Sequence, residues 1–233
     1  MMMKKIIIGI IIALLAAGNI YFYCKSKNNV AEPEVNAVRF RNNASLASAT
    51  SAYKYAAPVY SIDAEMTKVD KSRNELEQYA SKNKCNTKYA FVIDMRIPSF
   101  KKRFFVFDLA KDSIINSGYV AHGTGSETFK NELIFSNVPD SRCTSLGKYK
   151  IGASYKGMYG LSYRLYGLDS SNSNAQIRAI VLHGHGCVPD KGYDEYPICF
   201  SYGCPMVSTL FLQILKKYID KQGKEPILLS IIY

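Results

Sequence analysis

The chain has 233 residues and a mass of 26.1 kDa, which leaves room for one domain with attachments. With 48% hydrophobic and 21% charged residues, the composition excludes a globally disordered chain and supplies enough apolar side chains for a sizeable core. The 30 Lys and Arg residues exceed the 19 Asp and Glu residues by 11, and this positive charge fits nucleic acid, an anionic membrane or an acidic cell-wall polymer equally well.

An apolar run near the beginning predicts a membrane-associated segment. Lysines precede and follow residues 6–23, and only Asn19 interrupts the apolar side chains between them. A helix of this length rises about 27 Å, slightly less than the roughly 30 Å of a bilayer core. A retained signal-anchor fits best, a cleaved signal peptide is second and a buried core helix is third. We therefore assign residues 1–27 to a signal-anchor or signal peptide in contact with inner-membrane lipid, and we expect the rest of the chain outside the cytoplasm, in the periplasm or cell wall.

Residues 28–86 are predicted to form a tether followed by one amphipathic helix. Up to about residue 54 the segment is rich in Asn, Ala and Ser, a composition typical of weakly ordered linkers. From Ser61 to about Lys82, apolar side chains recur among many charges, and Ser61 or Asp63 can cap the helix. The apolar positions are Met66, Val69, Leu76 and Tyr79.

Residues 87–233 have the pattern of a β-rich α+β domain. Short segments rich in aromatic and β-branched residues predict six or seven strands, at 89–94, 103–108, 113–121, 148–153, 162–166, 179–183 and 227–233. One helix is predicted near the end, because residues 207, 210, 211, 214, 215, 218 and 219 are apolar and share one helical face. Gly223 can cap this helix, and Pro226 prevents its continuation.

A histidine and a cysteine stand where a strand and a helix can bring them together. His183-Gly184 ends an apolar predicted strand, and Ser201-Tyr-Gly-Cys204-Pro205 leads directly into the predicted helix. A thiol at a helix start meets unsatisfied N–H groups and the positive end of the helix dipole, which lower its pKa. We therefore predict Cys204 as a nucleophile and His183 as its base. Of the other two histidines, His122 stands in a glycine-rich segment that we interpret as a turn. His185-Gly186-Cys187 resembles the nucleophile motif, but no HG pair stands 14 to 17 residues before it, and we do not assign it a catalytic role.

The same residues resemble the catalytic signature of the L,D-transpeptidases (YkuD-like), an HG pair followed by S/T-x-G-C. The similarity is to the murein L,D-transpeptidase catalytic-domain family and covers about residues 87–233. This resemblance implies a mixed β-sheet or sandwich with one long helix following the catalytic cysteine. Further matching segments are 135–137, 145–149, 155–157, 164–168, 174–175 and 178–184.

The resemblance implies peptidoglycan stem peptides as substrates. Cys204 would attack the L,D bond of a tetrapeptide stem, form a thioester, release D-Ala and pass the acyl group to an amine, with His183 as the base. The Gly184 carbonyl would orient the imidazole, and the N–H groups of Gly203 and Cys204 would form an oxyanion hole. No metal, organic cofactor or nucleic acid is implied, and we expect a monomer. Substrate contacts are assigned to Ser201, Tyr202, Tyr149, Arg164 and Arg178.

One departure from the family pattern concerns substrate binding. The family often has Arg immediately before the S-x-G-C-P element, and this chain has Phe200 there. If that Arg binds a substrate carboxylate, another cation must do so here, and we name Arg164 or Arg178.

Three alternatives to transpeptidation stay open. Water instead of an amine as acceptor would make the protein an L,D-carboxypeptidase. His183, His185 and Cys187 alternate along the chain, and Cys199 and Cys204 could complete a tetrahedral zinc shell with them. A non-catalytic wall-binding module is the third alternative.

The cysteine count predicts two disulfides. Of six cysteines, Cys24 lies at the membrane edge, and removal of the proposed nucleophile leaves four in the exported part. Cys187 and Cys199 flank an insertion between base and nucleophile, and we predict that they are bonded across it. Cys85 and Cys143 would then form the second pair.

Overall fold

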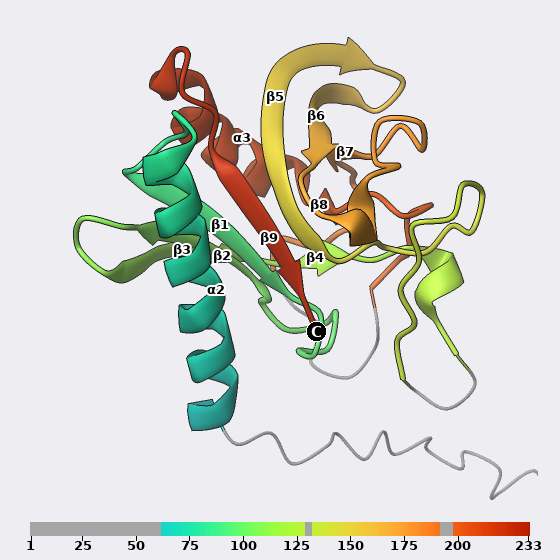
Figure 1. Ribbon diagram of the computed structural model, residues 1–233. Coiled ribbons are helices and arrows are strands. Elements are labelled where there is room, and N and C mark those ends of the chain that lie inside the picture. The colour runs from blue at the N-terminus through green and yellow to red at the C-terminus, as the bar shows by residue number, and fades with distance from the viewer. Residues whose placement is uncertain (1–61, 129–131, 192–197) are drawn as a thin grey trace, which may run out of the picture. The chain divides into compact units, whose positions relative to one another are not determined.

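The computed structural model describes residues 62–128, 132–191 and 198–233 (Figure 1). The predicted membrane segment and the tether lie outside these described residues. Within the described part of the chain, no helix is both long enough and apolar enough to cross a membrane.

In the described residues, nine strands form one strongly curved mixed sheet, with the order β3-β2-β1-β9-β5-β6-β7-β8-β4 (Figure 1). The strands are β1 (Tyr89–Asp94), β2 (Phe104–Asp108), β3 (Ser113–Gly118), β4 (Val120–Ala121), β5 (Gly147–Gly157), β6 (Gly160–Gly167), β7 (Val181–Gly184), β8 (Met206–Val207) and β9 (Leu228–Ile232). Two neighbouring pairs are parallel, β1 with β9 and β7 with β8, and the other pairs are antiparallel. The predicted β-rich α+β class is confirmed.

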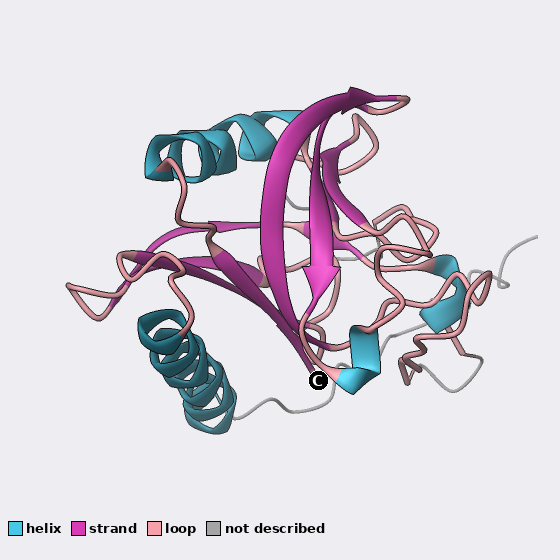
Figure 2. Ribbon diagram, turned by 45° about the horizontal axis from the view of Figure 1, so that its top comes forward, coloured by secondary structure: helices cyan, strands magenta, loops and turns pink. Residues whose placement is uncertain are grey.

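Two α-helices, α2 (Ile62–Lys82) and α3 (Thr209–Ile219), cover opposite faces of the β1–β2–β9 part of the sheet (Figure 2). Successive strand side chains point to opposite faces, so one strand can serve both helices. In β1, Ala90 and Val92 pack in the cluster that contains Val69, Leu76 and Ala80 of α2. Phe91 and Ile93 pack instead in the main core, which contains Phe211, Leu212 and Leu215 of α3.

Helix α2 packs on the sheet and shares a core with it. Its buried face shares a core with β1, β2 and β9, and Lys68 Nζ donates a hydrogen bond to the Tyr233 carbonyl at 2.6 Å. The structural unit therefore includes residues before position 87, where the sequence pattern placed the start of the domain.

The region after Cys204 differs from its prediction. Residues 206–207 form the short strand β8, and α3 begins only at Thr209, with the Ser208 side chain accepting from the Phe211 N–H at 3.0 Å. The prediction that Cys204 starts the helix is therefore wrong. The buried face of α3 therefore differs from the predicted one. Leu210, which was assigned to the buried face, is 63% exposed, whereas Leu212, which was not, is buried.

Candidate active site

Strand β7 carries His183 into the interior of the domain. All four residues of β7 are buried, because β6 and β8 flank the strand and α3 packs against it. The parallel register places His183 opposite Met206 of β8 and Gly184 opposite Val207. Cys204, two residues before Met206, is thereby brought beside Val181, two residues before His183.

A tight turn presents Cys204 at the entrance to β8. Ser201 Oγ donates to the Cys204 carbonyl at 2.6 Å and accepts from the Gly203 N–H at 3.2 Å. Gly203 has a φ of +112°, and a Cβ there would lie 2.7 Å from the Cys143 carbonyl oxygen, so both its backbone and its surroundings require glycine. The turn is anchored to the neighbouring chain, since the Ser201 N–H donates to the His122 carbonyl at 2.9 Å and the Thr124 N–H to the Ser201 carbonyl at 2.8 Å.

Burial, and not a helix dipole, dominates the electrostatics of the Cys204 thiol. Burial raises the pKa of Cys204 above its ordinary value, while the Val181 N–H, which donates to Sγ at 3.5 Å, and the positive charge of Arg178 oppose this shift. The prediction of a lowered pKa is therefore wrong in sign, because the thiol sits four residues before the Ser208 cap and not in the first turn of α3.

A hydrogen bond fixes which nitrogen of the His183 imidazole carries the proton. Nδ1 lies 3.3 Å from the Gly184 carbonyl oxygen. A carbonyl oxygen only accepts, so Nδ1 carries the proton and Nε2 keeps a lone pair that can receive another. Burial lowers the pKa of His183; the Gly184 hydrogen bond raises it and nearby His185 lowers it further. The resting pair is therefore a neutral thiol and a neutral imidazole.

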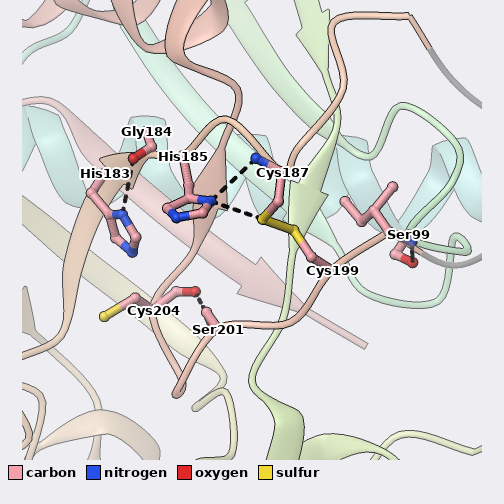
Figure 3. The surroundings of a disulfide bond; sticks show 9 residues. Ser99, His183, Gly184, His185, Cys187, Cys199, Ser201 and Cys204 are labelled. Carbon is pink, nitrogen blue, oxygen red and sulfur yellow. Dashed lines mark hydrogen bonds between the residues drawn. A yellow bond between two sulfur atoms is a disulfide. The ribbon is translucent and has the colours of Figure 1, made fainter. Parts of the chain in front are cut away.

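His183 and Cys204 open into one cavity of about 240 Å³. In Figure 3 the His183 ring points from β7 toward the Cys204 side chain, with His185 and the disulfide beyond them. The Tyr159 ring stacks on the His183 ring with 4.4 Å between centroids. The cavity lining consists of Tyr159, His183, His185, Cys187, Phe200, Ser201, Tyr202, Cys204 and Met206.

A family model for the L,D-transpeptidase catalytic domain matches residues 61–225, well over half of the chain. The chain belongs to this L,D-transpeptidase family. The match begins at the start of α2, in agreement with the packing of that helix on the sheet. A comparison with curated proteins gives no match.

Solved structures of L,D-transpeptidases and related proteins are similar at low identity. The L,D-transpeptidase of Xylanimonas cellulosilytica is 12% identical over 66% of this chain and 68% of its own, with a TM-score of 0.37. Bd1075 of Bdellovibrio bacteriovorus is 18% identical over 62% of this chain and 48% of its own, with a TM-score of 0.40. The cell-shape protein Pgp2 of Campylobacter jejuni is 11% identical over 68% and 53%, with a TM-score of 0.37. The chain thus spans about half to two thirds of these structures.

Only some of the predicted substrate-binding residues of the L,D-transpeptidase domain line the cavity. Ser201 and Tyr202 line the cavity, and Tyr202 is 68% exposed. Tyr149 is completely buried, its hydroxyl bonded to Ser145, and burial raises its pKa to about 12. A side chain with no exposed surface offers none to a substrate, so Tyr149 belongs to the core below the site.

The two arginines named as substitutes for the family Arg do not line the cavity. Arg178 donates to the backbone carbonyls of Ser136 and Cys143 and to Ser145 Oγ, so it supports the chain behind the turn that carries Cys204. Arg164 is exposed on β6, where its guanidinium lies 4.7 Å from the centroid of the Tyr155 ring.

One predicted disulfide of the L,D-transpeptidase domain is present and the other is not. Cys187 and Cys199 are bonded, which confirms that pairing (Figure 3). The pairing of Cys85 with Cys143 is wrong, because both are free, buried thiols in different places. Cys85 packs in the core below α2, whereas the Cys143 thiol donates to the Gly125 carbonyl at 3.0 Å.

Loss of the Cys187–Cys199 bond is expected to destabilise the domain by about 2–3 kcal/mol, because the bond closes a loop with a sequence separation of 12. A Cys187→Ser, Cys199→Ser double variant tests this by urea unfolding under non-reducing conditions. Wild type unfolded with a reductant is the control and should match the double variant. Equal stability of the oxidised wild type and the double variant would contradict the expectation.

His122 is a buried residue whose contacts with charged side chains could not be predicted from its neighbours in the sequence. Its buried ring lies between Arg103 Nη2, 2.7 Å from Nδ1, and Glu127 Oε1, 2.5 Å from Nε2. Phe200 packs edge-on against the ring at 5.4 Å. The pair His122-Gly123 thus lies against the turn of residues 201–204, and no local pattern could show this because Ser201 is about 80 residues away.

Proposed function

We propose that this L,D-transpeptidase family member is a cysteine-dependent acyltransferase acting on peptidoglycan stem peptides. The observation that carries the proposal is the shared cavity of Cys204 and His183, in which the imidazole keeps its Nε2 lone pair available. Proteins of this family act on such peptides. The geometry suits a mechanism in which the thiol loses its proton only as a carbonyl is attacked.

In the acylation half-reaction, His183 Nε2 takes the Cys204 proton while Sγ bonds to the carbonyl carbon of the L,D bond. The C–N bond then breaks, the imidazolium returns the proton to the leaving amine, and D-Ala departs from the thioester. The developing oxyanion needs N–H donors. The Gly203 N–H already donates to Ser201 Oγ. The Cys204 N–H, which donates to no protein acceptor among the described residues, is the better placed candidate.

In the second half-reaction, His183 deprotonates an incoming amine, which attacks the thioester and releases the Cys204 thiol. Water in place of the amine would give L,D-carboxypeptidase activity at the same residues. The zinc alternative needed Cys187 and Cys199 as thiolate ligands, and their disulfide removes both.

The proposed substrate and the disulfide both favour a location outside the cytoplasm. Structural disulfides persist in oxidising compartments, and peptidoglycan is assembled there. We propose that residues 1–27 hold the protein at the membrane, as their apolar run predicts.

The reaction is tested with purified protein, a disaccharide-tetrapeptide donor and a peptide amine acceptor, followed by mass spectrometry of products. Release of D-Ala with a new cross-link is the expected result. Release of D-Ala with only tripeptide product would identify the carboxypeptidase, and binding without any release of D-Ala would favour the wall-binding module.

A further inference from the structure

Among the residues that the structure describes, no charged side chain lines the cavity around Cys204. The nine residues that line it include no Asp, Glu, Lys or Arg. The position before the nucleophile turn is Phe200, which is 43% exposed and apolar. A tetrapeptide donor nevertheless ends in a carboxylate on the D-Ala that leaves. A cation that meets this carboxylate must therefore reach it from the rim of the cavity.

Arg142 is in contact with one residue of the cavity lining. Its guanidinium is 4.9 Å from the centroid of the Tyr202 ring, and Tyr202 lines the cavity. Stacking on an aromatic face holds a guanidinium plane in a fixed orientation while its N–H edges stay open. Arg142 is thus connected to the cavity through one side chain.

The main chain of Arg142 is fixed close to the nucleophile turn. A Cβ at Gly123 would lie 2.1 Å from the Arg142 carbonyl oxygen and 2.9 Å from the Gly203 backbone. The backbones of Arg142 and Gly203 therefore both pack against Gly123, with no room for a side chain between them. The Gly125 N–H donates to the Arg142 carbonyl at 3.0 Å. Arg142 also has a φ of 55°, a backbone conformation that this packing maintains.

The guanidinium of Arg142 has no anionic partner among the described residues, and its side chain is exposed. Arg164 likewise has no anionic partner among these residues, but its guanidinium lies over Tyr155, which does not line the cavity. The donors of three other arginines are engaged. Arg73 and Arg96 form ion pairs with Asp112 and Asp94, and Arg178 is bound to backbone carbonyls. An exposed guanidinium with free donors suits a carboxylate, which it can bind through two parallel hydrogen bonds.

We propose that Arg142, oriented by Tyr202, binds a carboxylate of the acyl-donor peptide, the terminal carboxylate of D-Ala being the first choice. The inference rests on the proposed function for its ligand, but peptide binding alone can test it. Arg142 acts here as a specificity residue, because a neutral amide cannot form the same charged pair.

The test is calorimetric titration of the Cys204→Ala protein, which cannot turn over, with three disaccharide-tetrapeptides: the parent, its D-Ala amide, and one with only internal carboxylates amidated. In this background Arg142→Ala should weaken parent binding about tenfold to a hundredfold. The same substitution should leave binding of the D-Ala amide unchanged, and Arg142→Lys should restore part of the loss. A loss that vanishes only with the internally amidated peptide supports carboxylate binding by Arg142 and moves it to an internal group.

Lys150→Ala is the matched control, because Lys150 is an exposed cation over a tyrosine ring, at 5.6 Å from Tyr166, and does not line the cavity. It removes the same charge and should leave binding unchanged. Equal weakening of all three peptides by Arg142→Ala, or no weakening of any, would overturn the inference. Wild type that binds the parent through Arg142 yet releases no D-Ala would refute the proposed function alone.

Discussion

Cys204→Ala is expected to abolish release of D-Ala, a loss on the order of 10⁶-fold in kcat, because no other free thiol is among the described residues that line the cavity. The fold should persist, since alanine is close in size and the thiol makes only weak contacts, at 3.5 Å to the Val181 N–H and 3.9 Å to the Ala179 carbonyl. Activity and thermal unfolding are measured together. Intact-protein mass spectrometry follows acylation of the thiol by a carbapenem, whose strained carbonyl presents the same electrophile as the proposed thioester-forming step.

Cys85→Ala is the matched control for this substitution. Cys85 is another free thiol; unlike the half-buried Cys204 it is fully buried, and it lies below α2 in a different core from the cavity. The control should keep both turnover and the carbapenem adduct. Full turnover by Cys204→Ala, or an adduct that persists on it, would show that another residue is the nucleophile.

His183→Gln is expected to lower kcat/KM by about 10²- to 10⁴-fold, the usual contribution of a general base. The pH profile gives a second signature. The base must be neutral, and burial lowers the pKa of His183, so activity of the wild type should be retained below the ordinary histidine value of about 6.5 and fall only at more acidic pH. The variant should lack this acidic limb.

His185→Ala is the comparison for His183. His185 is exposed, and its Nδ1 lies 2.9 Å from Cys187 Sγ rather than at the thiol of Cys204. Its removal should cost less than about tenfold. Equal losses of kcat/KM in the two variants would contradict the assignment of His183 as the base. A wild-type pH profile that falls already above the ordinary histidine pKa would contradict it as well.

The parts that sequence reasoning found are those with a local signal. Strand β1 is predicted at its observed bounds because a run of aromatic and β-branched residues identifies it. The spacing of Val69 and Leu76 similarly indicates the buried face of α2. His183 and Cys204 follow from a short motif, and the cavity that both line agrees with it.

The parts that sequence reasoning missed depend on contacts between distant segments. Strand β8 has two residues and exists only because β7 and β4 pair with it, so apolar periodicity merged it into the helix. Because α3 starts at Thr209 and not at Cys204, burial raises the pKa of Cys204, whereas a helix start would have lowered it. Arg142 stands 60 positions before Tyr202, and no pattern in either segment predicts that the two side chains are in contact. Counting cysteines shows how many could pair and not which are close, hence the wrong Cys85–Cys143 bond.

The central position of β9 has a consequence for how the domain folds. β9 pairs with β1 on one side and β5 on the other, so it alone joins the half of the sheet that carries β1–β3 to the half that carries the site. Ala90 meets Leu228, a partner about 140 positions later, and such distant pairings make folding slow. In a chain still emerging from the ribosome, the two halves can share the core around α3, but their strands are not joined into one sheet before residues 228–232 are available. We therefore expect the complete nine-stranded sheet to form late in folding, after residues 228–232 have paired on both sides.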